Sequence, residues 1–372
     1  MQVKWCKLNN FRNYNDAVIE FLPGINLISG QNGQGKTNIV EAIMLLALSK
    51  SPRTSHDEDM KKEGESHTEV EVAVDRSFGE LKIKCIMDSE NGKKFFVNGN
   101  EVKKVSEIFG NLVAVYFSPN DLRIVSDSPA ERRDFMDTDI SQLSGSYYNL
   151  LQRYNKILVQ RNRLLKTVKD KSLLLDQIEI WNEQLATVAG YIVKTRKNFI
   201  EKLKIPAKET MDYISKDADE LDISYVGAVG ETAEEIKQEI LKSLRFNIER
   251  DIELGYTTVG PHRDDIKFAI NGKDAKIFAS QGQQRSIVLS LKIAELQVFE
   301  KEIGEKPVLI LDDVFSELDS VRQKKMYDKF DGCQVLMTGT VFRFKPNEDY
   351  LTITVKNAVT KSKINKKKQV DN

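Results

Sequence analysis

Apolar and polar residues alternate along most of the first third of the chain, which is the pattern of half-buried β-strands. Alternating runs favour strands at 3–8 (VKWCKL), 17–21 (AVIEF), 69–74 (EVEVAV) and 81–87 (LKIKCIM). Two further runs, 25–28 (INLI) and 111–117 (NLVAVYF), indicate buried strands. The segment KFFVNGNEV turns at Asn98-Gly99, a dipeptide typical of a tight hairpin. We therefore predict a strand-rich N-terminal region.

From about Ser144 the apolar residues follow a helical period instead. One stripe comprises Leu151, Tyr154, Leu158 and Leu165, and a second comprises Ile178, Trp181, Leu185, Val188 and Ile192. Spacings of three, four and seven residues place each stripe on one face of an amphipathic helix. We interpret the stripes as the packing faces of a helical lobe. A long dimerising coiled coil is the weaker alternative, because the first helix spans only about 20 residues, or about 30 Å.

The last third of the chain mixes strands and helices. The pattern predicts a strand at 223–229, one charged helix over 231–255, a hairpin turning at Asn271-Gly272 and a helix over 283–304. Strands follow at VLILDD, QVLMTGT and LTITV. The Lys-rich tail, 356–372, is interpreted as a disordered solvated end, with weak attraction to phosphates as the alternative. We predict a discontinuous lobe of residues 1–140 and 300–372, and a helical lobe of residues 141–299.

The composition is that of an ordinary globular protein with balanced charge. The 372 residues include 56 Lys and Arg and 56 Asp and Glu, so any nucleic-acid surface must be a local patch. Three cysteines far apart in sequence indicate neither a disulfide framework nor a zinc site. The longest apolar stretch, 42–48, is far short of the roughly 20 residues that span a membrane. We expect a cytoplasmic protein with no membrane partner.

The stretch GQNGQGKT, residues 30–37, matches the P-loop pattern in full, with a strand before it and a helix after it. Backbone N–H groups of such a loop wrap phosphate oxygens, and the helix N-terminus adds positive potential. Lys36 would reach the β- and γ-phosphates, and Thr37 would bind Mg²⁺. We expect ATP contacts from Gly30, Gln31, Asn32, Gly33, Gln34, Gly35, Lys36, Thr37 and Asn38.

A strand that ends in two carboxylates supplies the second half of the metal site. In PVLILDD, Asp312 is the expected partner of Thr37 in holding Mg²⁺. Asp313 follows it, where a carboxylate could orient the attacking water. A solvated strand end is the alternative reading of this pair.

A second anion site lies at FASQGQQRS, residues 278–286, which opens a helix. Ser280 and Gly282, with Gln283 beside them, would present a hydroxyl and bare N–H groups at a helix N-terminus. The alternative is an ordinary helix cap by Ser280. One ATP does not need two such sites, so we expect this segment to bind the γ-phosphate held by a second copy. Two ATP molecules would then be buried in a head-to-tail dimer. The motif SELD, residues 316–319, supports this interpretation.

The order of these motifs resembles the α/β ABC-type ATPase heads of the SMC and recombination-repair group, and most closely the RecF family. The resembling stretches are LNNFRNY (8–14), PGINLISGQNGQGKTNIVEAI (23–43), FSPNDLRIVSDSPAERRDFMD (117–137), GYTTVGPHRDDI (255–266), SQGQQRS (280–286) and LILDDVFSELD (309–319). The resemblance implies an ATP-induced homodimer that clamps DNA, both duplex and single-strand gap junctions. With RecR-like and RecO-like partners it would help to load a recombinase. Arg12 and Asn13 lie where related heads contact the nucleotide, although a solvated turn remains an alternative there.

The chain departs from the family pattern at several positions. Asn120 and Asp127 replace residues usual in the 117–137 motif, Asp313 stands where a Glu is usual, and Thr338 is the nearest substitute for a switch histidine. Because Asp is one methylene shorter than Glu, and a misplaced base typically costs about 10²–10⁴-fold, we predict slow ATP hydrolysis. We assign Lys36, Asp312, Asp313 and Thr338 to catalysis.

Three further sites and two rival functions stay open at this point. Arg53, the pair Arg132 and Arg133, and the segment with His262 and Arg263 each admit a structural role beside a functional one. A transporter ATPase subunit would be expected to show a switch histidine and a Q-loop glutamine, and neither is found. An SMC-like chromosome clamp would need a long coiled coil between its halves.

Overall fold

A computed structural model describes residues 1–168, 170–216, 218–315, 318–330, 332–342 and 346–366. The chain divides into two compact units, one comprising residues 1–121 and 289–372 and the other residues 122–288. The sequence prediction placed these limits at 140/141 and 299/300. The limit at 288/289 falls inside helix α9 (Gln281–Ile303), so no break in the sequence pattern marks it.

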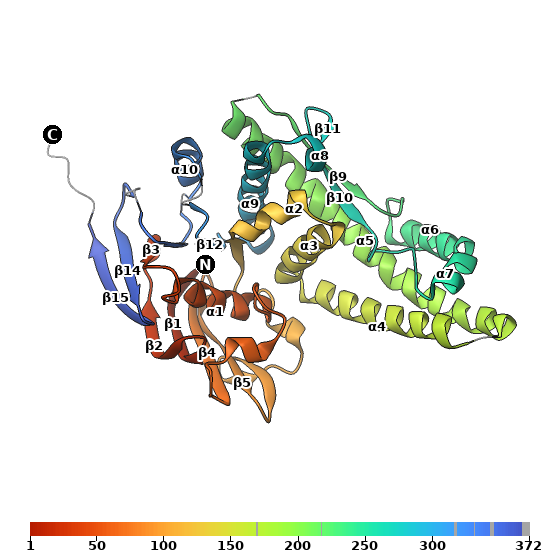
Figure 1. The fold of residues 1–372 in the computed structure, drawn as a ribbon, viewed down its shortest axis with the longest axis horizontal. Coiled ribbons are helices and arrows are strands. Elements are labelled where there is room, and N and C mark those ends of the chain that lie inside the picture. Colours follow the sequence, from red (N-terminus) through yellow and green to blue (C-terminus); the bar gives the residue numbers. More distant parts are fainter. Residues whose placement is uncertain (169, 217, 316–317, 331, 343–345, 367–372) are drawn as a thin grey trace. The chain divides into compact units, whose positions relative to one another are not determined.

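An antiparallel sheet forms one layer of the first unit (Figure 1). Its strand order is β2-β1-β4-β5-β6-β7, and it is built by consecutive hairpins apart from the β1–β4 pairing. Alternate residues of β4 and β5 are buried, because the sheet packs on one face only. The strands are β1 (Gln2–Phe11), β2 (Tyr14–Glu20), β4 (His67–Arg76), β5 (Gly79–Asp88), β6 (Gly92–Val97) and β7 (Asn100–Glu101).

A second, mixed sheet carries the phosphate and metal motifs. Its order is β15-β14-β3-β13-β12-β8; all neighbours are parallel except β15, which pairs antiparallel with β14. Strands β12 and β13 are buried at every residue, as expected of parallel strands covered on both faces. The strands are β3 (Ile25–Ser29), β8 (Ala114–Phe117), β12 (Val308–Asp312), β13 (Val335–Gly339), β14 (Tyr350–Lys356) and β15 (Val359–Asn365).

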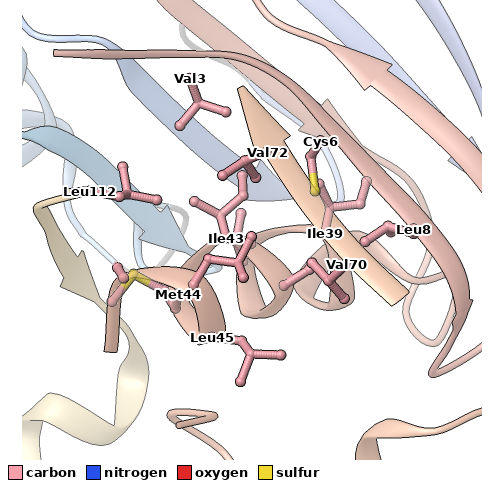
Figure 2. Packing of buried hydrophobic residues seen from close by; sticks show 14 of the residues in the cluster. Val3, Cys6, Leu8, Ile39, Ile43, Met44, Leu45, Val70, Val72 and Leu112 are labelled. Atoms are coloured by element: carbon pink, nitrogen blue, oxygen red, sulfur yellow. The ribbon is translucent and has the colours of Figure 1, made fainter. Parts of the chain in front are cut away.

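Helix α1 (Lys36–Leu48) supplies much of the core of this unit. Figure 2 shows its side chains Ile39 and Ile43 beside Cys6 and Val72, which come from β1 and β4. Nearly every residue of the helix is buried, which explains why it reads as a continuous apolar run instead of an amphipathic stripe. Short helical segments η1 (Asp57–Met60), η2 (Val105–Glu107) and η3 (Pro119–Leu122), and helix α10 (Ser320–Tyr327), complete the elements assigned here.

The second unit is mainly helical, with a small antiparallel sheet of order β11-β10-β9. Helices α4 and α5 lie side by side, and α6 packs on α5 (Figure 1). The helices are α2 (Arg123–Ser126), α3 (Pro129–Leu143), α4 (Gly145–Thr167), α5 (Lys171–Ser215), α6 (Ala233–Phe246), α7 (Ile248–Leu254), α8 (Ala275–Phe278) and the start of α9. The strands are β9 (Leu221–Val226), β10 (Asp265–Ile270) and β11 (Lys273–Asp274).

Three details of the sequence prediction are corrected by this unit. Helix α5 continues to Ser215 through Pro206, and Thr210 Oγ1 donates to the Pro206 carbonyl at 2.8 Å. The charged segment 231–255 is two helices that meet at Asn247, whose side chain donates to the Ser243 carbonyl. The second hairpin is short, because residues 275–278 form helix α8 instead of a strand.

The interpretation of the Lys-rich tail as a disordered end is also corrected. Residues 359–365 form β15, which pairs with β14 along its whole length. Thr, Val and Ile alternate with lysines in this segment, so it has strand propensity in spite of its charge. Residues 367–372 lie outside the described part of the chain.

Candidate nucleotide-binding site

The P-loop connects β3 to α1, as predicted. Gly33 and Gly35 adopt φ of 77° and 109°, in the left-handed region that glycine enters without strain. A Cβ at Gly35 would lie 2.8 Å from Asn13 Oδ1, and a Cβ at Gly30 would lie 2.5 Å from the Val355 carbonyl. Both glycines therefore allow neighbouring segments to pack against the loop. No side chain caps the start of α1, so its first N–H groups stay available to a phosphate.

Lys36 folds over the loop that precedes it. Its Nζ donates to the Gln31 carbonyl at 3.1 Å, and only 4% of the residue is exposed. This position holds the ammonium group inside the curve of the loop, where the β- and γ-phosphates of a nucleotide would take over its hydrogen bonds.

Asp312 receives hydrogen bonds from three elements at the carboxyl edge of the parallel sheet. Thr37 Oγ1 donates to its Oδ1 at 3.0 Å, and Thr338 Oγ1 donates to the same oxygen at 2.7 Å. Tyr116 Oη donates to Oδ2 at 2.9 Å. The hydroxyl of Thr37 and the carboxylate of Asp312 are hard oxygen donors of the kind that Mg²⁺ prefers, and they already converge. These two residues therefore fit the predicted metal site.

Tyr116 is a site residue that the sequence reasoning missed. It lies on β8, which pairs in parallel with β12 so that Tyr116 is opposite Ile310. Burial, and next the charge of Asp312, raise the pKa of the phenol well above its usual range. Tyr116 therefore remains a hydrogen-bond donor to the carboxylate. The polar ring inside the run NLVAVYF was the one available sign.

Asp313 has an unusual backbone conformation. Its φ is 56°, and its N–H donates to Thr338 Oγ1 at 2.9 Å. Asp and Asn enter this left-handed region far more readily than longer side chains, which gives a backbone reason for Asp here. Burial, more than the nearby charge of Asp312, raises the pKa of the Asp313 carboxyl, and Lys36 opposes the shift. A raised pKa makes the carboxylate a stronger base for water.

Thr338 is buried beneath both acidic residues. Its hydroxyl accepts from the Asp313 N–H and donates to Asp312. The side chain thus fixes the carboxylate of one residue and the backbone of the next. Its predicted role in place of a switch histidine stays a prediction.

A buried carboxylate on α1 organises the flank of the P-loop. Glu41 is fully buried and forms ion pairs with Arg12, at 2.5 Å, and with Arg53, at 2.9 Å. Arg53 also donates to Asn38 Oδ1, and Ser51 Oγ donates to Glu41. The two arginines that sequence reasoning left open are therefore brought together by Glu41, which it missed.

The tip of the loop is held from two sides. The Gln34 carbonyl accepts from Asn13 Nδ2 and from the Ala358 N–H, both at 3.2 Å. The side-chain oxygen of Gln34 accepts from the Asn357 N–H at 2.6 Å. The β14–β15 turn, Asn357 and Ala358, therefore fixes the P-loop. This contact was missed because the segment was interpreted as a disordered tail.

The second predicted anion site lies at the start of α9, in the other unit. Ser280 and Gln283 bond reciprocally: the Gln283 N–H donates to Ser280 Oγ at 3.2 Å, and the Ser280 N–H donates to Gln283 Oε1 at 2.9 Å. Gln283 Nε2 also donates to Asp219. The structure thus brings Ser280, Gly282 and Gln283 together and shows the helix cap that was one of the two readings. In the SELD motif, Ser316 and Glu317 lie outside the described residues.

The remaining candidates have structural partners. Arg132 pairs with Asp265 at 2.6 Å, and Arg133 donates to the Asp264 carbonyl. His262 bonds Tyr154 Oη through Nδ1 at 2.6 Å and the Thr257 carbonyl through Nε2 at 3.0 Å. Asn120 is exposed, and Asp127 pairs with Arg123 at 2.9 Å.

This geometry is accompanied by clear similarity to known proteins. The profile of the RecF/RecN/SMC N-terminal domain family matches residues 2–341, which sets the class of protein. "DNA replication and repair protein RecF" from Alkaliphilus oremlandii is 42% identical over 345 residues, covering 92% of this chain and 94% of that protein. Its counterpart from Ruminiclostridium cellulolyticum is 43% identical over 346 residues, covering 91% and 93%. The chain therefore belongs to the RecF family.

Solved structures agree with this assignment. A structure of the recombination mediator protein RecF with ATP in the RecFOR pathway has a TM-score of 0.90 and 37% identity, covering 97% of each chain. An Smc head bound to the C-winged helix domain of ScpA has a TM-score of 0.57 at 15% identity, which shows a common fold. The predicted family and ABC-type head fold are confirmed, and the DNA replication and repair function is favoured over a transporter subunit or a chromosome clamp.

Within the described residues, no helix combines the length and apolar character needed to cross a lipid bilayer.

Proposed function

We propose that this protein is an ATP-controlled DNA clamp of recombinational repair and replication, in which ATP closes a homodimer on DNA and slow hydrolysis reopens it. The observation that carries the proposal is the convergence of Thr37, Thr338 and Tyr116 on Asp312 beside a complete P-loop. The family assignment supplies the DNA context. The RecF relative of known structure is described with ATP.

Each residue of the nucleotide site has a distinct task in this proposal. The loop from Gly30 to Gly35 offers N–H groups to the phosphates, and Lys36 neutralises their charge. Thr37 and Asp312 would hold Mg²⁺, which supplies charge neutralisation at the phosphates. Asp313, with its raised pKa, accepts the proton of the attacking water. The remaining expected contacts, Arg12, Asn13 and Asn38, border the loop.

Dimerisation follows from the second anion site. We propose that Ser280, Gly282 and Gln283 of one copy contact the γ-phosphate held by the P-loop of the other. The Gln283 side chain accepts from the Ser280 N–H in the cap, and in the proposed contact a phosphate oxygen replaces it as the acceptor.

The partners proposed are duplex DNA and single-strand gap junctions, with RecR-like and RecO-like mediators that help to load the recombinase. The support is the RecF membership of the chain and the RecFOR context of the solved relatives. We place the protein in the cytoplasm, where bacterial DNA is repaired.

The test is DNA binding with ATP, with ADP and without nucleotide, on gapped and uniform duplexes across a range of salt concentrations. We expect tight binding with ATP only, together with ATP-induced dimers in size-exclusion chromatography and a low rate of hydrolysis that DNA stimulates. Binding that is equal in all three nucleotide states would refute the clamp. A fast, DNA-independent ATPase would instead favour a transporter-type enzyme.

A further inference from the structure

The charged side chains of helix α4 are all positive. Its 23 residues contain no Asp or Glu, although the whole chain has as many acidic as basic residues. Four basic side chains, Arg153, Lys156, Arg163 and Lys166, are exposed, and the fifth, Arg161, is buried. A solvated helix in a protein of balanced charge would ordinarily carry both signs.

The exposed basic residues share one face with uncharged hydrogen-bonding side chains. Arg153, Lys156, Gln160 and Arg163 follow each other at spacings of three, four and three residues, which is one side of a helix. Asn149, Gln152 and Thr167 are also exposed on this helix. We call Arg153, Lys156, Gln160 and Arg163 the basic face of α4. From Arg153 to Arg163 it is about 15 Å long.

Several basic residues of the neighbouring helices, in contrast, form ion pairs with carboxylates. In α5, Lys171, Lys204 and Lys208 form ion pairs with acidic residues from other segments of the same unit. Arg245 of α6 pairs with Glu179 in the same way. Among the described residues, no carboxylate forms an ion pair with Arg153, Lys156 or Arg163. The ion pairs of the described residues therefore leave the positive charge of the basic face without a carboxylate partner.

A buried network holds α4 firmly in its unit. Arg161 is fully buried, and its Nη1 donates to Asp251 at 2.8 Å and to Thr257 at 2.7 Å. Its Nε donates to Asn182 of α5 at 2.9 Å. Because breaking a buried ion pair leaves an uncompensated buried charge, this network fixes α4 to α5 and α7. The basic face is thus carried by a rigid element, which preserves the spacing of its charges.

We propose that the basic face of α4 binds the phosphate backbone of duplex DNA; this inference rests on the proposed DNA clamp. Charge complementarity favours this ligand, since duplex DNA carries about one negative charge per 1.7 Å of its axis. Arg, Lys and Gln are also the side chains that contact phosphate oxygens without reading the base sequence. The absence of exposed aromatic residues on this face agrees with backbone contact instead of base stacking.

The test is the triple variant Arg153→Ala, Lys156→Ala, Arg163→Ala, studied as the full-length chain with ATP and a uniform duplex oligonucleotide. Each phosphate contact contributes a slope of about −0.9 to the dependence of log K on log salt, so the slope should fall by about two to three. The DNA Kd at moderate salt should rise about tenfold or more. ATP affinity and ATP-induced dimerisation should be unchanged.

The matched control removes the same charge from α5: Lys171→Ala, Lys204→Ala, Lys208→Ala. These lysines are paired at the surface, so their loss should change neither the slope nor the fold appreciably. A charge-conserving variant, Arg153→Lys with Arg163→Lys, should retain most of the wild-type affinity. It also separates loss of charge from damage to the helix.

A wild-type slope and affinity in the triple variant would overturn the inference and leave the DNA clamp standing. Failure of the wild-type protein to bind DNA in any nucleotide state would overturn the clamp and the inference together. Binding of a polyglutamate peptide that the triple substitution abolishes, with DNA binding unchanged, would assign the face to an acidic protein and likewise overturn it.

Discussion

The two regions that we propose to bind phosphate are built in opposite ways. The P-loop is supported by Asn13, by the β14–β15 turn and by the Thr37–Asp312 bond. The segment at the start of α9 is supported mainly by itself, through the Ser280–Gln283 cap, and is preceded by the exposed side chains of Ile277 and Phe278. The first region has the support that a nucleotide pocket needs, whereas the second is a surface that a second copy could cover.

The largest expected effect is the loss of dimerisation at the second region. Ser280→Arg should abolish ATP-induced dimers, because the bulky cation occupies the space of the γ-phosphate from the other copy. Nucleotide affinity of the monomer should stay near wild type. Sizing with and without ATP, together with nucleotide titration, measures both quantities. Ser280→Ala removes the hydroxyl without adding bulk or charge, so it should weaken dimerisation less than Ser280→Arg does. An equal loss of ATP binding and dimerisation in Ser280→Arg would contradict the contact in trans.

A substitution in the P-loop should reduce ATP affinity first and dimerisation only as a consequence. Lys36→Ala removes a charge-assisted contact, and a loss of about 1.5–3 kcal/mol corresponds to a roughly 10- to 150-fold weaker ATP affinity. Dimerisation should fail only as a consequence, and should recover at high ATP concentration. If saturating ATP binding left the variant monomeric, the two regions would not be separable as described.

Catalysis within the first region should change by a smaller factor. Asp313→Glu should raise the single-turnover hydrolysis rate about tenfold, because the longer side chain brings the base closer to the water. The left-handed φ of residue 313 disfavours Glu, so thermal stability should fall slightly. Asp313→Asn keeps the backbone conformation and should slow hydrolysis. A Glu variant no faster than wild type would show that the carboxylate reach is not limiting.

Removing the hydrogen bond from Tyr116 to Asp312 should have a modest effect on the Mg²⁺ dependence of ATP binding. Tyr116→Phe removes one hydrogen bond to the carboxylate, worth about 1 kcal/mol, or roughly a fivefold change. We expect this change in the Mg²⁺ concentration that half-saturates ATP binding, with the ATP affinity at high Mg²⁺ nearly unchanged. If Tyr116→Phe and the wild type bound ATP equally at all Mg²⁺ concentrations, the Tyr116 hydroxyl would have no effect on the Mg²⁺ affinity of the site.

The smallest expected effect concerns stability in the second unit. Burial raises the pKa of Asp264 to about 6, so its contribution to stability is present below its ordinary pKa of 3.8 and is lost as pH rises through 6. Burial lowers the pKa of His262 to about 4, so its contribution is present above 6.5 and is lost as pH falls toward 4. The two oppose each other between about pH 4 and 6. Asp264→Asn should therefore make the melting temperature fall more steeply on acidification than in the wild type, and an unchanged pH profile would contradict this.

The sequence revealed those parts of the site whose chemistry is contiguous along the chain. The P-loop and the double aspartate are short motifs, and short apolar runs indicated the strands that carry them. Tyr116 and Glu41 could not be found in this way, because they reach the site through strand pairing and helix packing. The turn at Asn357 and Ala358 was hidden by the lysines around it, and the apolar stripe 178–192 covers only part of α5.

The hydrogen bond between Asn357 and Gln34 joins residues that are 323 positions apart. At a synthesis rate of roughly 5–20 residues per second, about 15–65 s separate the appearance of the two residues on the ribosome. The helical unit is therefore synthesised completely before the hydrogen bond from Asn357 to Gln34 of the P-loop can form. A nascent chain that ends before Asn357 therefore lacks this support of the P-loop, whatever the state of the rest of the nucleotide site.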